Sequence, residues 1–229
     1  MINDVIFVYP ISNGYSHKLK IMILRSEFTN NYQIPDLTHA GFDIVALAAS
    51  AGGLTAITEV LSALPTDFKA AIVIVQHLDP KSRSLMAEIL RRHIVLDVKQ
   101  AEDGDKLNPG MVYIAPPNHH LLVNCDATLS LSQSEKVHFL RPAADVLFKS
   151  VAGSYKDRAI AVVLTGNGCD GAIGVKAIHK MGGIIIVEDE KTAEFKGMPL
   201  AAIETGNVDF IIPKEGISSA LINLVMARG

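Results

Sequence analysis

Short segments that are almost entirely apolar recur along the chain, and helical patterns of apolar residues alternate with them. The segments are residues 44–48, 71–75, 159–164 and 184–187. Strands without alternating polar positions are typical of parallel sheets whose two faces are both covered by helices. The sequence therefore predicts an α/β fold with a doubly wound, mostly parallel sheet and helices on both faces.

Two regions depart from this pattern. Residues 120–124 and 128–132 alternate around Asp126, which predicts an antiparallel hairpin at one edge of the sheet. Residues 1–40 show no sustained period, and we expect an N-terminal extension there, either a short arm or a poorly ordered linker. The predicted domain covers residues 41–229.

The composition limits the classes of partner and compartment. The net charge is −3 and no long basic run occurs, which argues against nucleic acid as a partner. Cys125 and Cys169 are the only cysteines and form no CxxC motif, so we expect neither a disulfide framework nor a zinc site. The sequence shows no signal pattern and no apolar run of the ~18–20 residues that a membrane helix needs. We therefore expect a cytoplasmic protein without membrane insertion.

A single hydroxyl group lies in a turn of small residues between a predicted strand and a predicted helix. Residues 49–53 read Ala-Ser-Ala-Gly-Gly, and apolar residues at helical spacing follow from Leu54. Ligands bind at the carboxyl ends of strands in open α/β sheets, and small neighbours let a substrate approach Ser50. The alternative is that Ser50 only caps the helix, since serine is a favoured N-cap residue.

Two more polar side chains follow the carboxyl ends of other predicted strands. His77 comes after residues 71–75, and Asp170 lies in the glycine-rich turn after residues 159–164. Because these strand ends share one edge, a nucleophile, a base and a carboxylate could meet there, as acyl transfer requires. Each residue also has a structural interpretation, His77 as a strand-end histidine bonded to a carbonyl group and Asp170 as a helix cap.

Position alone does not rank Asp170 above other acids. Asp79, Glu188 and Asp189 also lie at the ends of predicted strands. The chain lacks the G-x-S-x-G motif of ordinary α/β-hydrolases. A nucleotide-binding domain is a weaker alternative, because residues 48–53 do not match G-x-G-x-x-G and no phosphate-loop lysine follows.

Six sequence blocks occur in an order that a known family shares. They are AASAGG (48–53), VQHLDP (75–80), RPAADVLF (141–148), LTGNGCDGAIG (164–174), EDEKTAEFKGMPLAAI (188–203) and GNVDFIIP (206–213). Together they resemble the catalytic domain of the chemotaxis protein-glutamate methylesterases, the CheB family, over residues 42–225. Two positions depart from the family pattern: Ala48, where glycine is usual, and Asn167, where methionine is common.

The resemblance implies a role for each candidate residue. Ser50 is implied as the nucleophile, His77 as its general base and Asp170 as the acid that orients the histidine. Main-chain N–H groups of Ala51 and Asn167 are implied as the oxyanion hole, which tolerates a change of side chain. The mechanism needs no metal and no cofactor.

The resemblance also implies the substrate and partners. Family members hydrolyse glutamate γ-methyl esters on chemoreceptor helices, releasing methanol, and some also deamidate receptor glutamines. Arg141 and Met198 are candidates to line a groove for the receptor helix, or else a surface charge and a core filler. Residues 1–40 are too few for a receiver domain, so we expect a constitutive enzyme or control by a separate receiver or kinase component. The alternative function is a catalytically silent binding module in a chemosensory complex.

Overall fold

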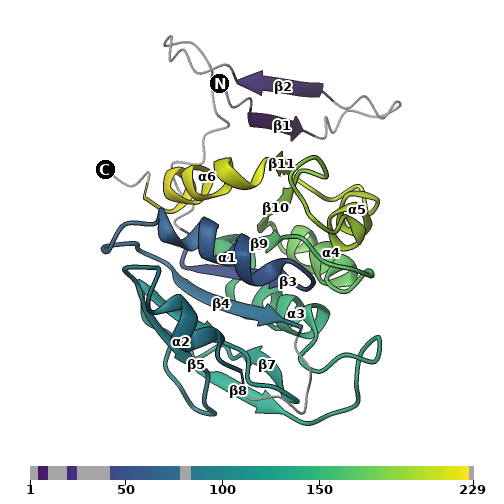
Figure 1. The fold of residues 1–229 in the computed structure, drawn as a ribbon. Helices are drawn as coiled ribbons and strands as arrows, with labels where there is room; N and C mark the ends of the chain where they lie inside the picture. Colours follow the sequence, from purple (N-terminus) through teal and green to yellow (C-terminus); the bar gives the residue numbers. More distant parts are fainter. Residues whose placement is uncertain (1–4, 10–19, 25–41, 78–83, 227–229) are drawn as a thin grey trace.

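The computed structural model describes residues 5–9, 20–24, 42–77 and 84–226, with side chains from residue 42 onward. A nine-stranded sheet has the order β2-β1-β11-β10-β9-β3-β4-β6-β5, and the seven strands from β11 to β5 are parallel (Figure 1). This confirms the predicted, mostly parallel sheet. Its strands are β1 (Val5–Tyr9), β2 (Lys20–Leu24), β3 (Ile44–Ala49), β4 (Ala71–Gln76), β5 (Asp97–Gln100), β6 (Met111–Ile114), β9 (Ala159–Val163), β10 (Ile184–Glu188) and β11 (Phe210–Ile212).

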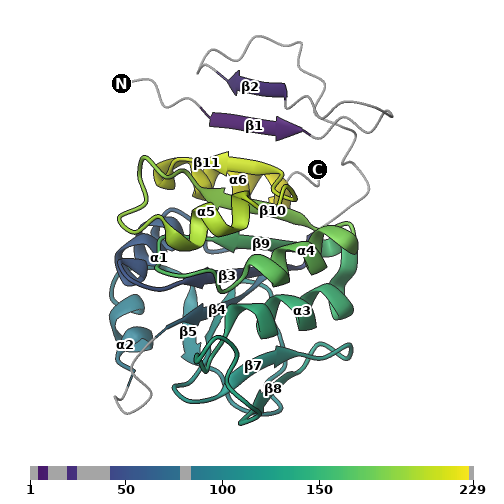
Figure 2. The same cartoon turned by 90° about the vertical axis from the view of Figure 1, so that its right-hand side faces the viewer.

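Helices cover both faces of this sheet, as the apolar strands predict (Figure 2). One face carries α1 (Gly53–Ser62), α2 (Met86–Leu90) and α6 (Lys214–Met226). The other carries α3 (Ala144–Tyr155), which the short helix η1 (Lys156–Arg158) follows, α4 (Ala172–Lys180) and α5 (Gly197–Ile203). In the part of the chain that the structure describes, no helix has the length and apolarity needed to cross a bilayer.

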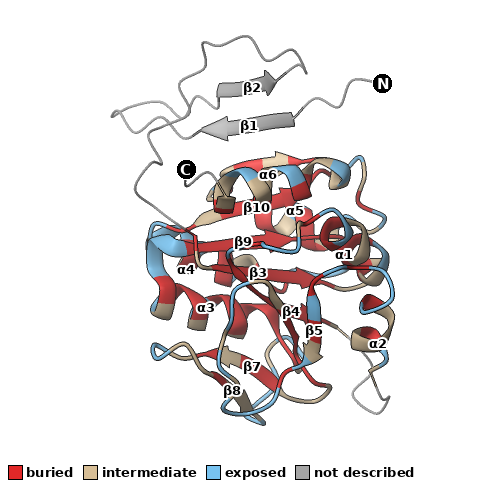
Figure 3. Ribbon diagram, turned by 90° about the vertical axis from the view of Figure 1, so that its left-hand side faces the viewer, coloured by how far each residue is buried: buried red, intermediate tan, exposed pale blue. Residues whose placement is uncertain are grey.

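The central strands supply side chains to two separate hydrophobic cores. Along β3, Val45 and Leu47 point into the core beneath α1 and α6, whereas Ile44, Ala46 and Ala48 point into the core beneath α3 and α4. All five are fully buried, and Figure 3 shows the same burial along the neighbouring strands. Burial on both faces explains why these strands show no polar alternation.

The predicted antiparallel hairpin is present as β7 (His120–Val123) and β8 (Leu129–Ser132). It forms a two-stranded sheet of its own and packs against α3 instead of pairing with the main sheet. Buried Leu121, Val123 and Leu129 join it to the core beneath α3. The hairpin therefore extends one end of the molecule without lengthening the main sheet.

The antiparallel strands of the main sheet, β1 and β2, fall within the predicted N-terminal extension. They pair with each other, and β1 pairs with β11 through Ile6 opposite Ile211 and Phe7 opposite Phe210. The other residues of the predicted extension lie outside the described part of the chain.

Candidate active site

Ser50 lies in a left-handed turn between β3 and α1. Gly52 precedes the helix with φ of 73°, a backbone conformation that favours glycine. The N-cap position belongs to Gly52 and no side chain caps this helix, which contradicts the alternative that Ser50 is its cap. The Ser50 N–H donates to the Thr165 carbonyl oxygen at 3.0 Å, and Gln76 Nε2 donates to the Ser50 carbonyl oxygen at 2.7 Å. The loop after β9 and the end of β4 thus both hold the Ser50 turn in place.

His77 lies beside Ser50 and contacts Asp170. The main-chain N–H of His77 donates to the Ala49 carbonyl oxygen at 3.1 Å, continuing the β3–β4 register to the Ser50 position. His77 Nε2 is 2.8 Å from Asp170 Oδ2, and the two side chains are 8% and 1% exposed. The contact leaves Nδ1 to accept a proton. In the described residues no hydrogen bond joins Ser50 Oγ to the ring, and such catalytic bonds often form only when substrate binds.

Hydrogen bonds keep Asp170 ionised although it is buried. Burial alone would raise the pKa of Asp170, but bonds from His77 and from the N–H groups of Asp145 and Ala144 outweigh burial and lower the pKa below its ordinary value. Oδ2 accepts the Ala144 N–H at 2.6 Å, and Oδ1 accepts the Asp145 N–H at 3.0 Å. These donors form the first turn of α3, where the helix dipole also favours negative charge. An ionised carboxylate suits the role of an orienting acid.

The other described carboxylates at strand ends form hydrogen bonds with groups other than His77. Glu188, at the end of β10, is fully buried and accepts an N–H group from the loop after β9 at 2.8 Å. The Asp189 carboxylate accepts the Lys191 N–H within its own loop region at 2.9 Å. Asp79 lies outside the described residues. Of the carboxylates that the structure describes, Asp170 is the one that contacts His77.

A second buried carboxylate, which the sequence pattern did not indicate, completes a reciprocal pair of helix caps. Asp145 Oδ1 accepts the N–H groups of Gly171 and Gly174 at 3.1 and 2.7 Å, which caps α4. Asp170 in turn caps α3. The other oxygen of Asp145 lies 3.3 Å from His138 Nε2. The only local signal for this role was an acid in the first turn of a helix.

Two main-chain N–H groups near Ser50 are available to an oxyanion. Within the described residues, the N–H groups of Ala51 and Asn167 have no hydrogen-bond partner. The Asn167 loop lies against the Ser50 turn, because a Cβ added to Gly166 would be 2.8 Å from Ser50 Cβ. Such unpaired donors are what an oxyanion hole requires.

Arg141 and Met198 both occupy supporting positions. Met198 is 1% exposed and packs in the core beneath α3, which fits the alternative of a core filler and offers no surface to a groove. Arg141 donates from Nε and Nη2 to Asn118 Oδ1 and from Nη1 to the carbonyl oxygens of Gln133 and Ser134. Arg141 therefore holds the segment between β8 and α3 through hydrogen bonds instead of presenting a free charge.

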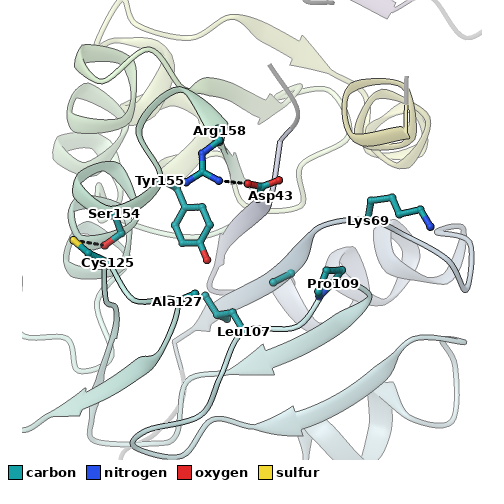
Figure 4. Close-up of a pocket in the computed structure, with 10 residues that line it drawn as sticks. Asp43, Lys69, Leu107, Pro109, Cys125, Ala127, Ser154, Tyr155 and Arg158 are labelled. Atoms are coloured by element: carbon teal, nitrogen blue, oxygen red, sulfur yellow. Dashed lines mark hydrogen bonds and ion pairs between the residues drawn. The ribbon is translucent and has the colours of Figure 1, made fainter. Parts of the chain in front are cut away.

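A pocket of about 300 Å³ lies at the opposite, amino edge of the sheet (Figure 4). Asp43 and Ala71 line it at the starts of β3 and β4, and Asp43 pairs with Arg158. The Arg158 guanidinium lies 5.3 Å from the centre of the Tyr155 ring. None of the candidate catalytic residues is among the lining residues. Across the described residues, no group of three or more His, Cys, Asp or Glu could hold a metal ion.

Comparison with known proteins decides the family. The sequence matches the family model described as CheB methylesterase over residues 45–221. The chain belongs to the CheB methylesterase family. This is a family of hydrolases, so the predicted resemblance and enzyme class are confirmed.

Relatives and a solved structure agree with this assignment. A relative from Leptospira interrogans is 42% identical over 183 residues, which cover 80% of this chain and 95% of the relative. The Pyrococcus horikoshii protein-glutamate methylesterase/protein-glutamine glutaminase is 41% identical over 79% of this chain, which spans 50% of that relative. The crystal structure of the Thermotoga maritima CheB methylesterase catalytic domain has a TM-score of 0.78 and 38% identity, covering 81% of this chain and 100% of that one. These likenesses confirm the predicted fold class.

Proposed function

We propose that this CheB-family chain hydrolyses the γ-methyl esters of glutamate side chains on chemotaxis receptors and releases methanol. The observation that carries the proposal is the 2.8 Å contact between His77 Nε2 and Asp170 Oδ2 beside the Ser50 turn. The names of relatives from Pyrococcus horikoshii and Thermotoga maritima, protein-glutamate methylesterase/protein-glutamine glutaminase, support the same reaction. They also support deamidation of receptor glutamines by the same site.

The first half of the reaction transfers the acyl group to Ser50. Ser50 Oγ attacks the ester carbonyl carbon while His77 Nδ1 takes the hydroxyl proton. The N–H groups of Ala51 and Asn167 donate to the oxyanion, and Asp170 stabilises the positive charge on the imidazole. The bond to the methoxy oxygen then breaks, and the proton from His77 allows methanol to leave.

The second half releases the product. A water molecule attacks the acyl carbon while His77 takes one of its protons. The bond between Ser50 Oγ and the acyl carbon breaks, and His77 returns the proton to Ser50. The released side chain is a glutamate. With a glutamine substrate, ammonia takes the place of methanol as the leaving group.

The proposed setting is the cytoplasm, with methylated receptor helices as the partner. A separate receiver or kinase component is the candidate regulator. The net charge of −3 and the lack of a long basic run support a protein substrate over nucleic acid.

Methanol release from membranes that carry a methylated receptor tests the proposal. We expect the wild-type chain to release methanol, and we expect none after the esters have been removed from the same membranes with mild base. Membranes whose receptor carries glutamines at the same positions should yield ammonia. If the wild-type chain produced neither methanol nor ammonia, a silent binding module would replace the proposed esterase.

A further inference from the structure

Large apolar side chains in the described residues are exposed mainly at one edge of the molecule. Leu85 lies at the start of α2, Phe139 in the segment before α3, and Ile173 and Leu200 in the first turns of α4 and α5. Val95 lies at the other edge, before β5. Their exposed fractions are 50% for Leu85, 60% for Val95, 94% for Phe139, 48% for Ile173 and 37% for Leu200.

The four helix starts share an edge with the candidate active site. The helices α2, α4 and α5 each join two parallel strands and so begin at the carboxyl edge, and α3 begins there too, because Asp170 accepts its first N–H groups. Ser50 and His77 follow the carboxyl ends of β3 and β4, and Asp170 directly precedes the Gly171 cap of α4. We call Leu85, Phe139, Ile173 and Leu200 the apolar rim. The rim thus lies at the same edge as the candidate nucleophile.

Phe139 is the most exposed member of the rim and lies at the tip of a strained turn. Val137 and Leu140 exchange two main-chain hydrogen bonds, of 3.1 and 2.8 Å, around His138 and Phe139. His138 and Phe139 have φ of 50° and 63°, in the left-handed region that normally takes Asn and Gly in such turns. In Figure 1 this connection extends beyond the ends of β3 and β4. Strain of this kind persists where the surrounding structure enforces it, often at functional sites.

The turn lies near the reciprocal helix caps, and its segment is held at its base. His138 Nε2 lies 3.3 Å from Asp145 Oδ2, and Asp145 also caps the helix that follows Asp170. Arg141 clasps the base of the same segment through the carbonyl oxygens of Gln133 and Ser134. Phe139 thus points into solvent from a segment whose base Arg141 holds.

We propose that the apolar rim is the docking surface for the substrate helix, with Phe139 as its main contact. This inference rests on the proposed function. A glutamate methyl ester is a short side chain, so the helix that carries it must come close to the rim when the ester reaches Ser50. Residues three and four positions away on that helix lie on the same face, and an apolar stripe there would cover Phe139. The partner is thus an amphipathic helix with an apolar face beside the ester.

Kinetics with two substrates tests the docking surface. Phe139→Asp should raise the KM for methylated receptor membranes at least about tenfold, because it replaces burial of a phenyl ring with burial of a charge. It should leave the hydrolysis of p-nitrophenyl acetate, a small ester that needs no docking, within about twofold of wild type. Val95→Asp, at the opposite edge, is the matched control. It should change neither the KM for receptor membranes nor the rate of p-nitrophenyl acetate hydrolysis. Thermal unfolding of each variant checks that the fold is kept.

Each other outcome overturns a specific part of the inference. An unchanged receptor KM in Phe139→Asp would exclude Phe139 as a contact, and equal losses on both substrates would show a structural role. If Phe139→Asp instead dissociated a dimer of this chain in sedimentation and kept its receptor KM, the rim would be an interface between two copies. Failure of the proposed function is distinguishable, because the wild-type chain itself would then release no methanol.

Discussion

Asp170 receives three hydrogen bonds on its two carboxylate oxygens. His77 and Ala144 donate to Oδ2, and Asp145 donates to Oδ1. The carboxylate is 1% exposed, so water has little access to replace any of these donors. The same side chain thus contacts the imidazole of His77 and caps α3. Its charge is set by the protein around it and not by solvent.

Asp170→Asn should remove most of the activity while preserving the shape of the site. An amide group carries no negative charge to stabilise the imidazolium, and its NH₂ group can favour the wrong tautomer of His77. We expect kcat for methanol release to fall about 10³–10⁴-fold. Asp189→Asn is the matched control, since Asp189 bonds within its own loop region, and it should stay active. Full activity in Asp170→Asn would contradict the assigned role.

Gly166 leaves no room for a side chain next to Ser50. A Cβ there would lie 2.4 Å from Met198 Sδ and 2.8 Å from Ser50 Cβ. We expect Gly166→Ala to lower the free energy of unfolding by about 1–3 kcal/mol and to reduce kcat by displacing Ser50. Gly153→Ala within α3 is the control, because its added Cβ meets nothing within 4 Å and alanine favours a helix. Urea unfolding measures the stability of the variant, and methanol release measures its kcat. If both values for Gly166→Ala equalled those of wild type, this expectation would be wrong.

At the scale of the element, α3 and α4 begin beside each other and exchange caps. The first N–H groups of a helix have no partner inside the helix, and here a carboxylate from the start of the other helix supplies the acceptor. Asp170 serves α3, and Asp145 serves α4. Because Asp170 also contacts His77, the position of the His77 ring depends on how these two helices meet.

Asp145→Ala should destabilise the protein through loss of the α4 cap. It leaves the buried N–H groups of Gly171 and Gly174 without an acceptor, which should lower the free energy of unfolding by about 2–3 kcal/mol. Asp145→Asn keeps an acceptor oxygen and should lose less. Urea unfolding of the two variants measures the difference. Equal stability of Asp145→Ala and wild type would refute the reciprocal cap.

For the whole molecule, local sequence patterns predicted the layers of the fold. They did not predict which residues from distant parts of the chain lie side by side. The apolar strand 44–48 and the small turn at Ser50 predicted an α/β sheet with a candidate nucleophile at its carboxyl edge, because burial and turn chemistry are local. Position could not separate Asp170 from Glu188, because that choice depends on β9 lying beside β3. The cap by Asp145 likewise depends on a helix that begins 27 residues later, at Ala172.

The buried acid Glu188 should make the stability of the whole fold depend on pH. Burial raises the pKa of Glu188 above its ordinary value, although a bond from the Thr165 N–H and the charge of Lys214 lower it. The folded state therefore binds more protons than the unfolded state above about pH 4.3, and the contribution of Glu188 to stability declines as the pH rises. Glu188→Gln should gain stability relative to wild type between about pH 4 and about pH 7, as measured by urea unfolding. If the difference in free energy of unfolding between Glu188→Gln and wild type did not change with pH, this prediction would be wrong.

A comparison of two variants shows which side chain attacks the ester. Ser50 lies in the turn after β3, whereas Cys169, an exposed thiol next to Asp170, is the competing nucleophile in the same region. Methanol release from methylated receptor membranes should fall by about 10⁴-fold or more in Ser50→Ala and stay near wild type in Cys169→Ala. Activity that survives in Ser50→Ala but disappears in Cys169→Ala would identify Cys169 as the nucleophile and contradict the role proposed for Ser50.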